Sequence, residues 1–114
     1  MKIGVGCFLD EQLSSMVKRV SKSGECDIRH KQNEIIYDTQ VDHYLEDYLE
    51  EIIDIFIPAK YIDADDSDER IDYLKNVLER WKIFSVKADD IQIIIQAICK
   101  KRYQDEIEIF TEKV

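Results

Sequence analysis

The sequence predicts a mainly helical α+β fold, with four to five helices packed against a small β-hairpin near the N-terminus. Apolar residues recur at spacings of three and four along most of the chain, as they do on the buried face of a helix. Residues 25–38 instead alternate apolar and polar side chains, a pattern typical of strands. A length of 114 residues favours one domain. We expect residues 1–40 to hold a helix and the hairpin, and residues 41–114 to form a helical region.

The first helix is predicted to begin near Asp10 and to end at SKSG, where Gly24 can adopt a left-handed conformation. Its apolar face comprises Leu13, Met16, Val17 and Val20. In the hairpin, Cys26 and Ile28 are expected on one strand, and Ile35 and Tyr37 on the other.

The second helix is expected to be capped by Thr39 or Asp42 and to end before Pro58. A third helix is expected after DADDSDER, with Asp66 and Glu69 as a capping box. Its predicted buried face comprises Ile71, Leu74, Val77, Leu78 and Trp81. A fourth helix is expected in IQIIIQAICKKRY, with a basic C-terminal end, and a short fifth segment holds Ile107, Ile109 and Phe110.

The net charge of −9 is concentrated in the middle of the chain. Residues 35–72 contain two basic and thirteen acidic side chains, whereas the segments before and after each balance to +1. Such a segment repels phosphate and attracts basic proteins, so we expect no direct binding of nucleic acid. The second predicted helix carries acids opposite its apolar stripe with no basic residue among them, namely Glu46, Asp47, Glu50, Glu51 and Asp54. This pattern indicates a docking surface for a basic partner or, equally, a solvated face.

The stretch DADDSDER holds five acids in seven residues. A calcium loop needs Gly at its sixth place and Glu at its twelfth, where this chain has Asp68 and Leu74. We therefore favour the interpretation that this stretch forms the beginning of a helix. Asp63, Asp65 and Asp68 exceed what a cap needs and could extend the docking surface, so these three acids and the capping Asp66 join its predicted residues.

No catalytic motif is visible in the sequence: there is no Ser-His-Asp set, P-loop or Gly-rich phosphate loop. We therefore expect a non-enzymatic protein without a cofactor. Four residues could meet around zinc, but none of them forms the close pair typical of such sites. They are Cys7, Cys26, His30 and His43, and two core cysteines with two surface histidines are the favoured alternative.

Two short blocks, GCFLDEQL and SGECDI, resemble the N-terminal domain that precedes the catalytic part of bacterial HEPN/RES-type toxins and related conflict-system proteins. Members of that family open with C-x-x-C-F and Asp-Glu, then a short helix and a second cysteine pair, which together form a zinc-ribbon-like element. Cys7-Phe8, Asp10-Glu11 and Gly24-x-Cys26-Asp27 match these blocks, and RWKIF and IFTEKV resemble the helical region. Gly4 and Arg29 stand where the other two thiolates belong, so no zinc is expected.

The resemblance and the acidity together predict an immunity protein or antitoxin that neutralises a toxin, and the acidity favours a basic nuclease as that toxin. One alternative is a regulatory or recognition domain of a longer RES-type toxin, and another is a metal-dependent hydrolase that uses the middle carboxylates. The start of the chain lacks the pattern of a signal peptide and no apolar run is long enough to span a membrane, so we expect a cytoplasmic protein. The oligomeric state is left open.

Overall fold

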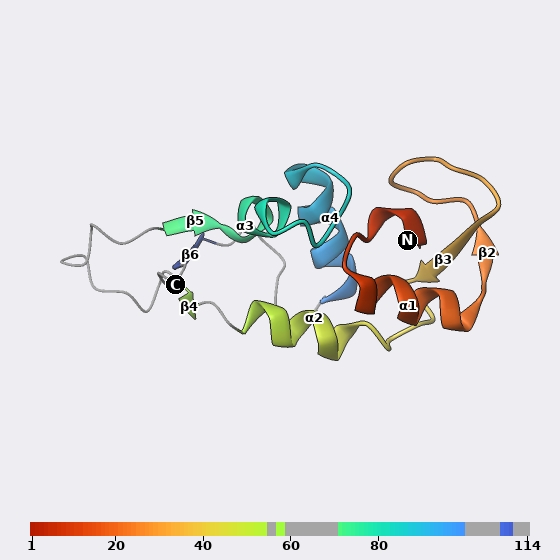
Figure 1. The fold of residues 1–114 in the computed structure, drawn as a ribbon, viewed down its shortest axis with the longest axis horizontal. Helices are drawn as coiled ribbons and strands as arrows, with labels where there is room; N and C mark the ends of the chain where they lie inside the picture. Colours follow the sequence, from red (N-terminus) through yellow and green to blue (C-terminus); the bar gives the residue numbers. More distant parts are fainter. Residues whose placement is uncertain (55–56, 59–70, 100–107, 111–114) are drawn as a thin grey trace.

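A computed structural model describes residues 1–54, 57–58, 71–99 and 108–110. Within these residues, four α-helices accompany a small antiparallel sheet at the N-terminus, so the predicted fold class is confirmed (Figure 1). The helices are α1 (Glu11–Val20), α2 (Glu46–Ile53), α3 (Leu74–Arg80) and α4 (Ala88–Ile98), with a 3-10 turn η1 (Val5–Cys7). The strands are β1 (Lys2–Gly4), β2 (Ser23–Gly24), β3 (Glu34–Asp38), β4 (Ile57–Pro58), β5 (Ile71–Tyr73) and β6 (Glu108–Phe110).

The N-terminal sheet has the order β1-β3-β2, with both neighbours antiparallel to β3. The predicted hairpin exists as β2–β3, but its first strand lies earlier than expected, with Gly24 opposite Glu34. Cys26 and Ile28 belong to the connecting loop, so their assignment to a strand was wrong. Strand β1, in which Ile3 pairs with Tyr37, was not predicted, because three residues ending in glycine are too short to show alternation.

Helix α1 begins as predicted and ends differently. The Asp10 carboxylate accepts a hydrogen bond from the Leu13 N–H at 3.0 Å, which caps the helix. The left-handed residue after the helix is Ser21 (φ 58°), whose hydroxyl donates to the Lys18 carbonyl. Gly24 was therefore wrongly predicted to close the helix. Its lack of a side chain instead suits β2, where a Cβ would lie 3.3 Å from Ile36.

Helix α2 starts at Glu46, later than predicted, and neither expected cap serves it. The Thr39 hydroxyl instead accepts a hydrogen bond from the Met1 ammonium group at 3.0 Å. The Asp42 carboxylate accepts from the Asp38 N–H and from Lys22. Both side chains are thus used to hold the turn after β3 rather than the helix.

Helix α3 is shorter than predicted because its expected first turn is a strand. Residues 71–73 pair with β6 in a second small sheet of order β4-β6-β5, and the helix begins at Leu74. The N-cap position of this helix is Tyr73, and the predicted capping box of Asp66 and Glu69 lies outside the described residues. Ile109 and Phe110 form β6, whereas Ile107 and the basic end of the fourth helix also lie outside them.

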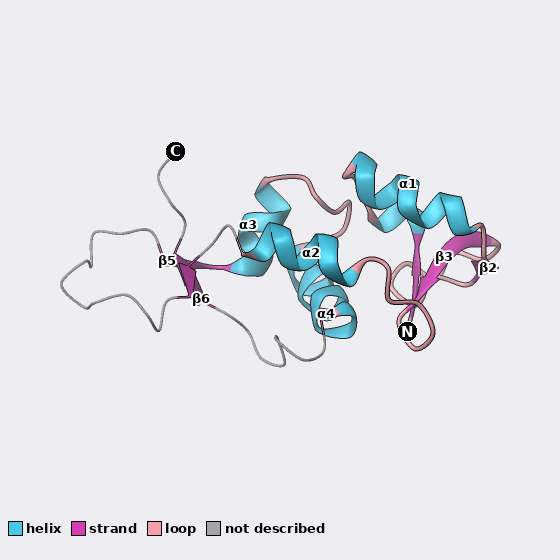
Figure 2. Cartoon of the chain, turned by 90° about the horizontal axis from the view of Figure 1, so that it is seen from below, coloured by secondary structure: helices cyan, strands magenta, loops and turns pink. Residues whose placement is uncertain are grey.

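One hydrophobic core joins the N-terminal sheet to all four helices, with α4 lying close to α3 (Figure 2). The predicted apolar face of α4 is confirmed: Ile91, Ile94, Ile95 and Ile98 are all buried. Trp81 is 46% exposed, so its assignment to the core was wrong, and Phe84 is the aromatic residue buried at this corner. No helix in the described parts combines the length and hydrophobicity needed to cross a membrane.

Candidate functional site

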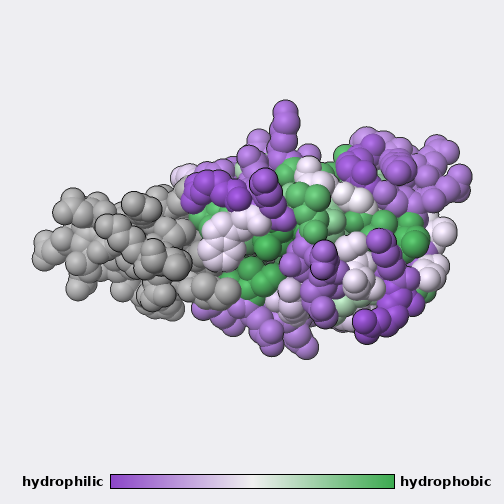
Figure 3. Space-filling model, in the orientation of Figure 1, coloured by the Kyte–Doolittle hydropathy of each residue, from purple (hydrophilic) through white to green (hydrophobic). Residues whose placement is uncertain are grey.

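The predicted acidic surface lies in part on α2. Leu45, Leu49 and Ile53 are buried beneath the helix, which turns the acids to the other side. The edge of the molecule that α2 forms is hydrophilic in the space-filling view (Figure 3). The structure brings five of the predicted residues together on this edge, all exposed or half-buried: Glu46, Asp47, Glu50, Glu51 and Asp54. We call these five residues the acidic face. The other four, Asp63, Asp65, Asp66 and Asp68, lie outside the described residues.

Little positive charge balances the acidic face within the described chain. The His43 ring Nδ1 lies 3.0 Å from the Glu46 carboxylate. Among the described residues no salt bridge involves Asp47, Glu50 or Glu51. Carboxylates four residues apart on a helix repel each other by a few tenths of a kcal/mol per pair. The face is thus a surface of one sign, held in place by the apolar side of its own helix.

Polar contacts fix where α2 sits. The Tyr48 hydroxyl donates to the Asp10 carboxylate at 3.2 Å, which ties the helix to the start of α1. Just before the helix, the buried Tyr37 hydroxyl donates to the Asp42 carbonyl at 2.8 Å. The Tyr37 ring packs edge-on against Tyr44, with ring centroids 4.9 Å apart. Burial, the largest cause, and nearby carboxylates together raise the pKa of Tyr37, so this hydroxyl stays a neutral donor.

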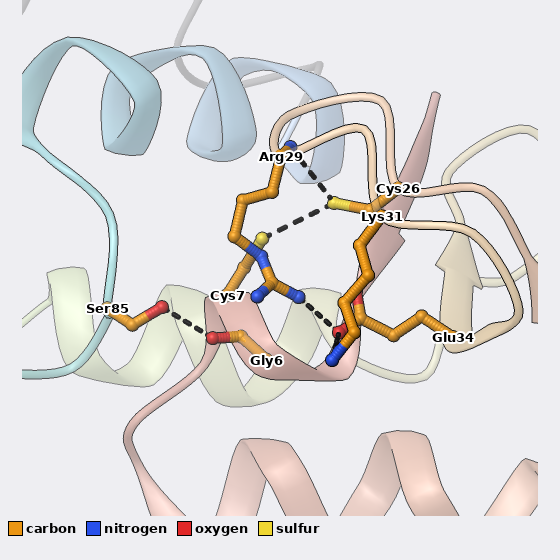
Figure 4. Close-up of polar contacts among 7 residues, drawn as sticks. All are labelled: Gly6, Cys7, Cys26, Arg29, Lys31, Glu34 and Ser85. Carbon is orange, nitrogen blue, oxygen red and sulfur yellow. Dashed lines mark hydrogen bonds and ion pairs between the residues drawn. The ribbon is translucent and has the colours of Figure 1, made fainter.

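A second candidate site lies between η1 and the β2–β3 loop, where two cysteines meet. The sulfurs of Cys7 and Cys26 are 3.6 Å apart, and both residues are fully buried (Figure 4). The Cys7 end is held by Ser85, whose backbone N–H donates to the Cys7 carbonyl and whose hydroxyl donates to the Gly6 carbonyl. The Cys26 end is held by its own N–H, which donates to the Lys31 carbonyl at 2.9 Å.

A partly buried ion pair adjoins these sulfurs. The Arg29 guanidinium lies beside the Cys7 sulfur and donates to Oε2 of Glu34, whose side chain is only 6% exposed (Figure 4). Two glycines make room for the pair. A Cβ on Gly4 would overlap the Glu34 carboxylate, and one on Gly6 would lie 2.4 Å from the guanidinium. The other oxygen of Glu34, Oε1, has no hydrogen-bond partner within the described part of the chain.

The two thiols differ in acidity. Burial, which is the largest influence, raises the pKa of Cys7 to about 12, although the Arg29 guanidinium acts in the opposite direction. Burial also acts to raise the pKa of Cys26. Hydrogen bonds from the backbone N–H groups of Arg29, Gly4 and Ile28, and from the Cys7 thiol, outweigh that effect and lower it. The ionised form of the pair is therefore a Cys26 thiolate that accepts a hydrogen bond from the Cys7 thiol.

The cluster does not fit the zinc site that the family resemblance implies. Two sulfurs bound to one tetrahedral zinc lie about 3.8 Å apart, close to the separation seen here. However, Gly4 offers no ligand, and Arg29 is a cation that cannot bind a metal. No group of three or more possible ligands occurs in the described residues. His30 and His43 are exposed, whereas both cysteines are buried, which matches the alternative favoured from the sequence.

Comparisons of the chain with protein-family models, with curated proteins and with solved structures find no match. The family resemblance, the immunity function and the toxin partner therefore stay predictions. The sequence analysis missed the ion pair of Arg29 and Glu34. Two glycines in GVGC, each where another group approaches the backbone closely, were the available signal.

Proposed function

We propose that the protein is a small non-enzymatic inhibitor, an immunity protein or antitoxin that binds a basic bacterial toxin through its acidic face. The observation that carries the proposal is the row of like charges on α2, in which Asp47, Glu50 and Glu51 make no salt bridge with the described residues. The repulsion between the pairs Glu46–Glu50 and Asp47–Glu51 makes this arrangement unfavourable in the free protein. Lysines and arginines on a partner relieve that repulsion.

The charge also suits the kinetics that an inhibitor needs. A surface of one sign attracts a partner of the opposite sign from a distance and raises the rate of association above that of neutral partners. Because the apolar side of α2 is anchored in the core, the helix presents its charges without first having to fold. The three free cysteines of the chain support a reducing compartment, the cytoplasm, as its place of action.

The proposal is tested by co-purification from the natural host, followed by a toxicity assay. Tagged wild-type protein is compared with the charge reversal Asp47→Lys/Glu51→Lys and with Glu25→Lys/Asp89→Lys, a control that makes the same charge change at exposed positions elsewhere. We expect the wild type and the control to recover one basic protein that the acidic-face variant loses. That protein should arrest growth when it is expressed alone and be harmless when it is co-expressed with the wild type. Recovery by the acidic-face variant, or a harmless partner, would overturn the proposal.

A further inference from the structure

The buried cysteine pair places two thiols in direct contact. Cys7 and Cys26 are 19 residues apart in the chain, yet their sulfurs lie 3.6 Å from each other. A disulfide needs a sulfur separation of about 2.05 Å, so the two sulfurs have to approach each other by about 1.5 Å. The backbone on each side is fixed by hydrogen bonds, which holds the thiols facing one another.

We infer that Cys7 and Cys26 form a redox-active dithiol, at which a hydroperoxide oxidises Cys26 and Cys7 then closes an intramolecular disulfide. This inference is independent of the acidic face and of any toxin partner. A modification site is thereby assigned to two cysteines for which the sequence favoured a place in the core over a zinc site.

The surroundings of Cys26 make it the attacking sulfur. Its sulfur accepts a hydrogen bond from the Arg29 backbone N–H at 3.4 Å, in a turn of the loop that also directs the N–H of Ile28 toward it. Such donors stabilise a thiolate, which is the reactive form of cysteine. The neighbouring Cys7 keeps its proton over the same pH range, so it is the resolving thiol.

Access to the sulfurs depends on side chains rather than on secondary structure. The Arg29 and Lys31 side chains run past the two sulfurs in the close-up (Figure 4). They are 30% and 64% exposed, and a path to the sulfurs requires Arg29 to leave the Glu34 carboxylate. A path opened in this way is narrow, which favours hydrogen peroxide over a bulky disulfide as the oxidant.

The proposed reaction is balanced by the peroxide alone. The Cys26 thiolate attacks one peroxide oxygen, the O–O bond breaks, and hydroxide leaves as Cys26 becomes a sulfenic acid. The Cys7 sulfur then attacks the Cys26 sulfur, the S–O bond breaks, and the oxygen leaves as water with the Cys7 proton. The hydroxide becomes water with the proton that Cys26 released on ionisation, so in total two thiols lose two protons and two electrons, and one hydrogen peroxide becomes two waters.

The test is oxidation of the folded protein with hydrogen peroxide, followed by alkylation in denaturant and peptide mapping. We expect a loss of about 2 Da per chain and one remaining alkylated cysteine, Cys99. The tryptic peptides 3–18 and 23–29 should be joined by the new disulfide. A Cys99→Ser variant should give the same product, whereas Cys7→Ser should stop at a Cys26 sulfenic acid that dimedone traps.

A matched reaction in urea separates the folded geometry from ordinary thiol chemistry. The unfolded chain should give disulfides among all three cysteines, because nothing then holds Cys7 and Cys26 together. Three alkylated cysteines after treatment of the folded protein would overturn the inference. So would links through Cys99, or the same mixture of products with and without urea.

Discussion

The Arg29 guanidinium donates a hydrogen bond to the carboxylate of Glu34, which is buried against Gly4 at the start of β3. The pair joins the β2–β3 loop to the sheet beside the two thiols. Charges that are removed from water need a partner, and loss of one partner leaves the other unsatisfied. The loop around Cys26 therefore depends on this polar contact in addition to the hydrophobic packing of Cys26 and Ile28.

Removal of the cation should destabilise the protein more than removal of both charges. We expect Arg29→Met to cost about 2–3 kcal/mol, below the 3–5 kcal/mol of a fully buried pair because Arg29 is partly exposed. The double variant Arg29→Met/Glu34→Gln should recover part of that loss. Urea unfolding followed by circular dichroism measures both. Equal stability of the single and double variants would show that the carboxylate is not stranded without its partner.

Glycine at position 4 should be required by the Glu34 side chain itself. A Cβ there would lie 1.5 Å from the carboxylate oxygen, so Gly4→Ala should cost about 1–3 kcal/mol through overpacking. Gly24→Ala is the matched control: its Cβ meets Ile36 at 3.3 Å, and we expect a change of less than about 1 kcal/mol. In a Glu34→Ala background the cost of Gly4→Ala should shrink. Strict additivity of the two substitutions would contradict this explanation.

Asp42 should contribute to stability in a pH-dependent way. Burial acts to raise the pKa of its carboxyl group, but Lys22 at 2.5 Å and the Asp38 N–H outweigh burial and hold it below the ordinary value of 3.8. The unfolded chain then binds the proton more tightly, so the contribution is present above pH 3.8 and is lost as the pH falls through the folded-state pKa. Asp42→Asn should lower stability at neutral pH by about 1 kcal/mol. It should also flatten the acid limb, which is the fall in the free energy of unfolding as the pH drops from neutral to acid.

The control for that experiment is Asp47→Asn, which removes an exposed carboxylate with no salt bridge in the described chain. Free energies of unfolding, measured in urea from pH 2 to pH 7, should keep the wild-type acid limb in this variant. An unchanged limb in Asp42→Asn would show that the pair with Lys22 contributes nothing.

The aromatic residues at the end of α3 should differ in their effect on stability. Phe84 is 2% exposed and packs against Phe8 with ring centroids 5.6 Å apart, so Phe84→Ala should cost about 3–5 kcal/mol. Trp81 is 46% exposed, and Trp81→Ala should cost about 1 kcal/mol or less. Thermal and urea unfolding of the two variants compares them directly. A larger loss for Trp81→Ala would place the tryptophan in the core, as the sequence alone had predicted.

Helical periodicity was sufficient to predict α1 and α4, because most of their apolar residues face one core, although Val20 at the end of α1 is exposed. Where the same residues are compatible with two different local structures, the sequence pattern predicted the wrong one. Ile71 fits the buried face of a helix, but residues 71–73 pair with β6, which is distant in sequence. Thr39 and Asp42 are good capping residues, yet they bind the N-terminus and Lys22 instead. Such partners are determined by the tertiary fold, because they lie far away in the sequence and are not visible in a short segment.

Of the two candidate sites, the acidic face could be predicted from the sequence and the cysteine cluster could not. The acids of α2 could be predicted because a helix places residues four apart on one face. The pairing of Cys7 with Cys26 was only one of several possibilities, and the ion pair of Arg29 with Glu34 was not foreseen. Both depend on how the loop between β2 and β3 folds over η1. Such a loop has no periodic pattern of apolar residues from which its conformation could be predicted.

The binding of a basic partner is tested most directly by the salt dependence of its association rate. The partner recovered by co-purification is measured against wild type, Asp47→Lys/Glu51→Lys and the control Glu25→Lys/Asp89→Lys by stopped flow. Charges at the rim of an interface act mainly on association. We expect the wild-type rate to fall steeply as salt rises, the control to follow it, and the acidic-face variant to associate slowly with a flattened salt slope. Identical rates and slopes for all three proteins would contradict the proposed role of the acidic face.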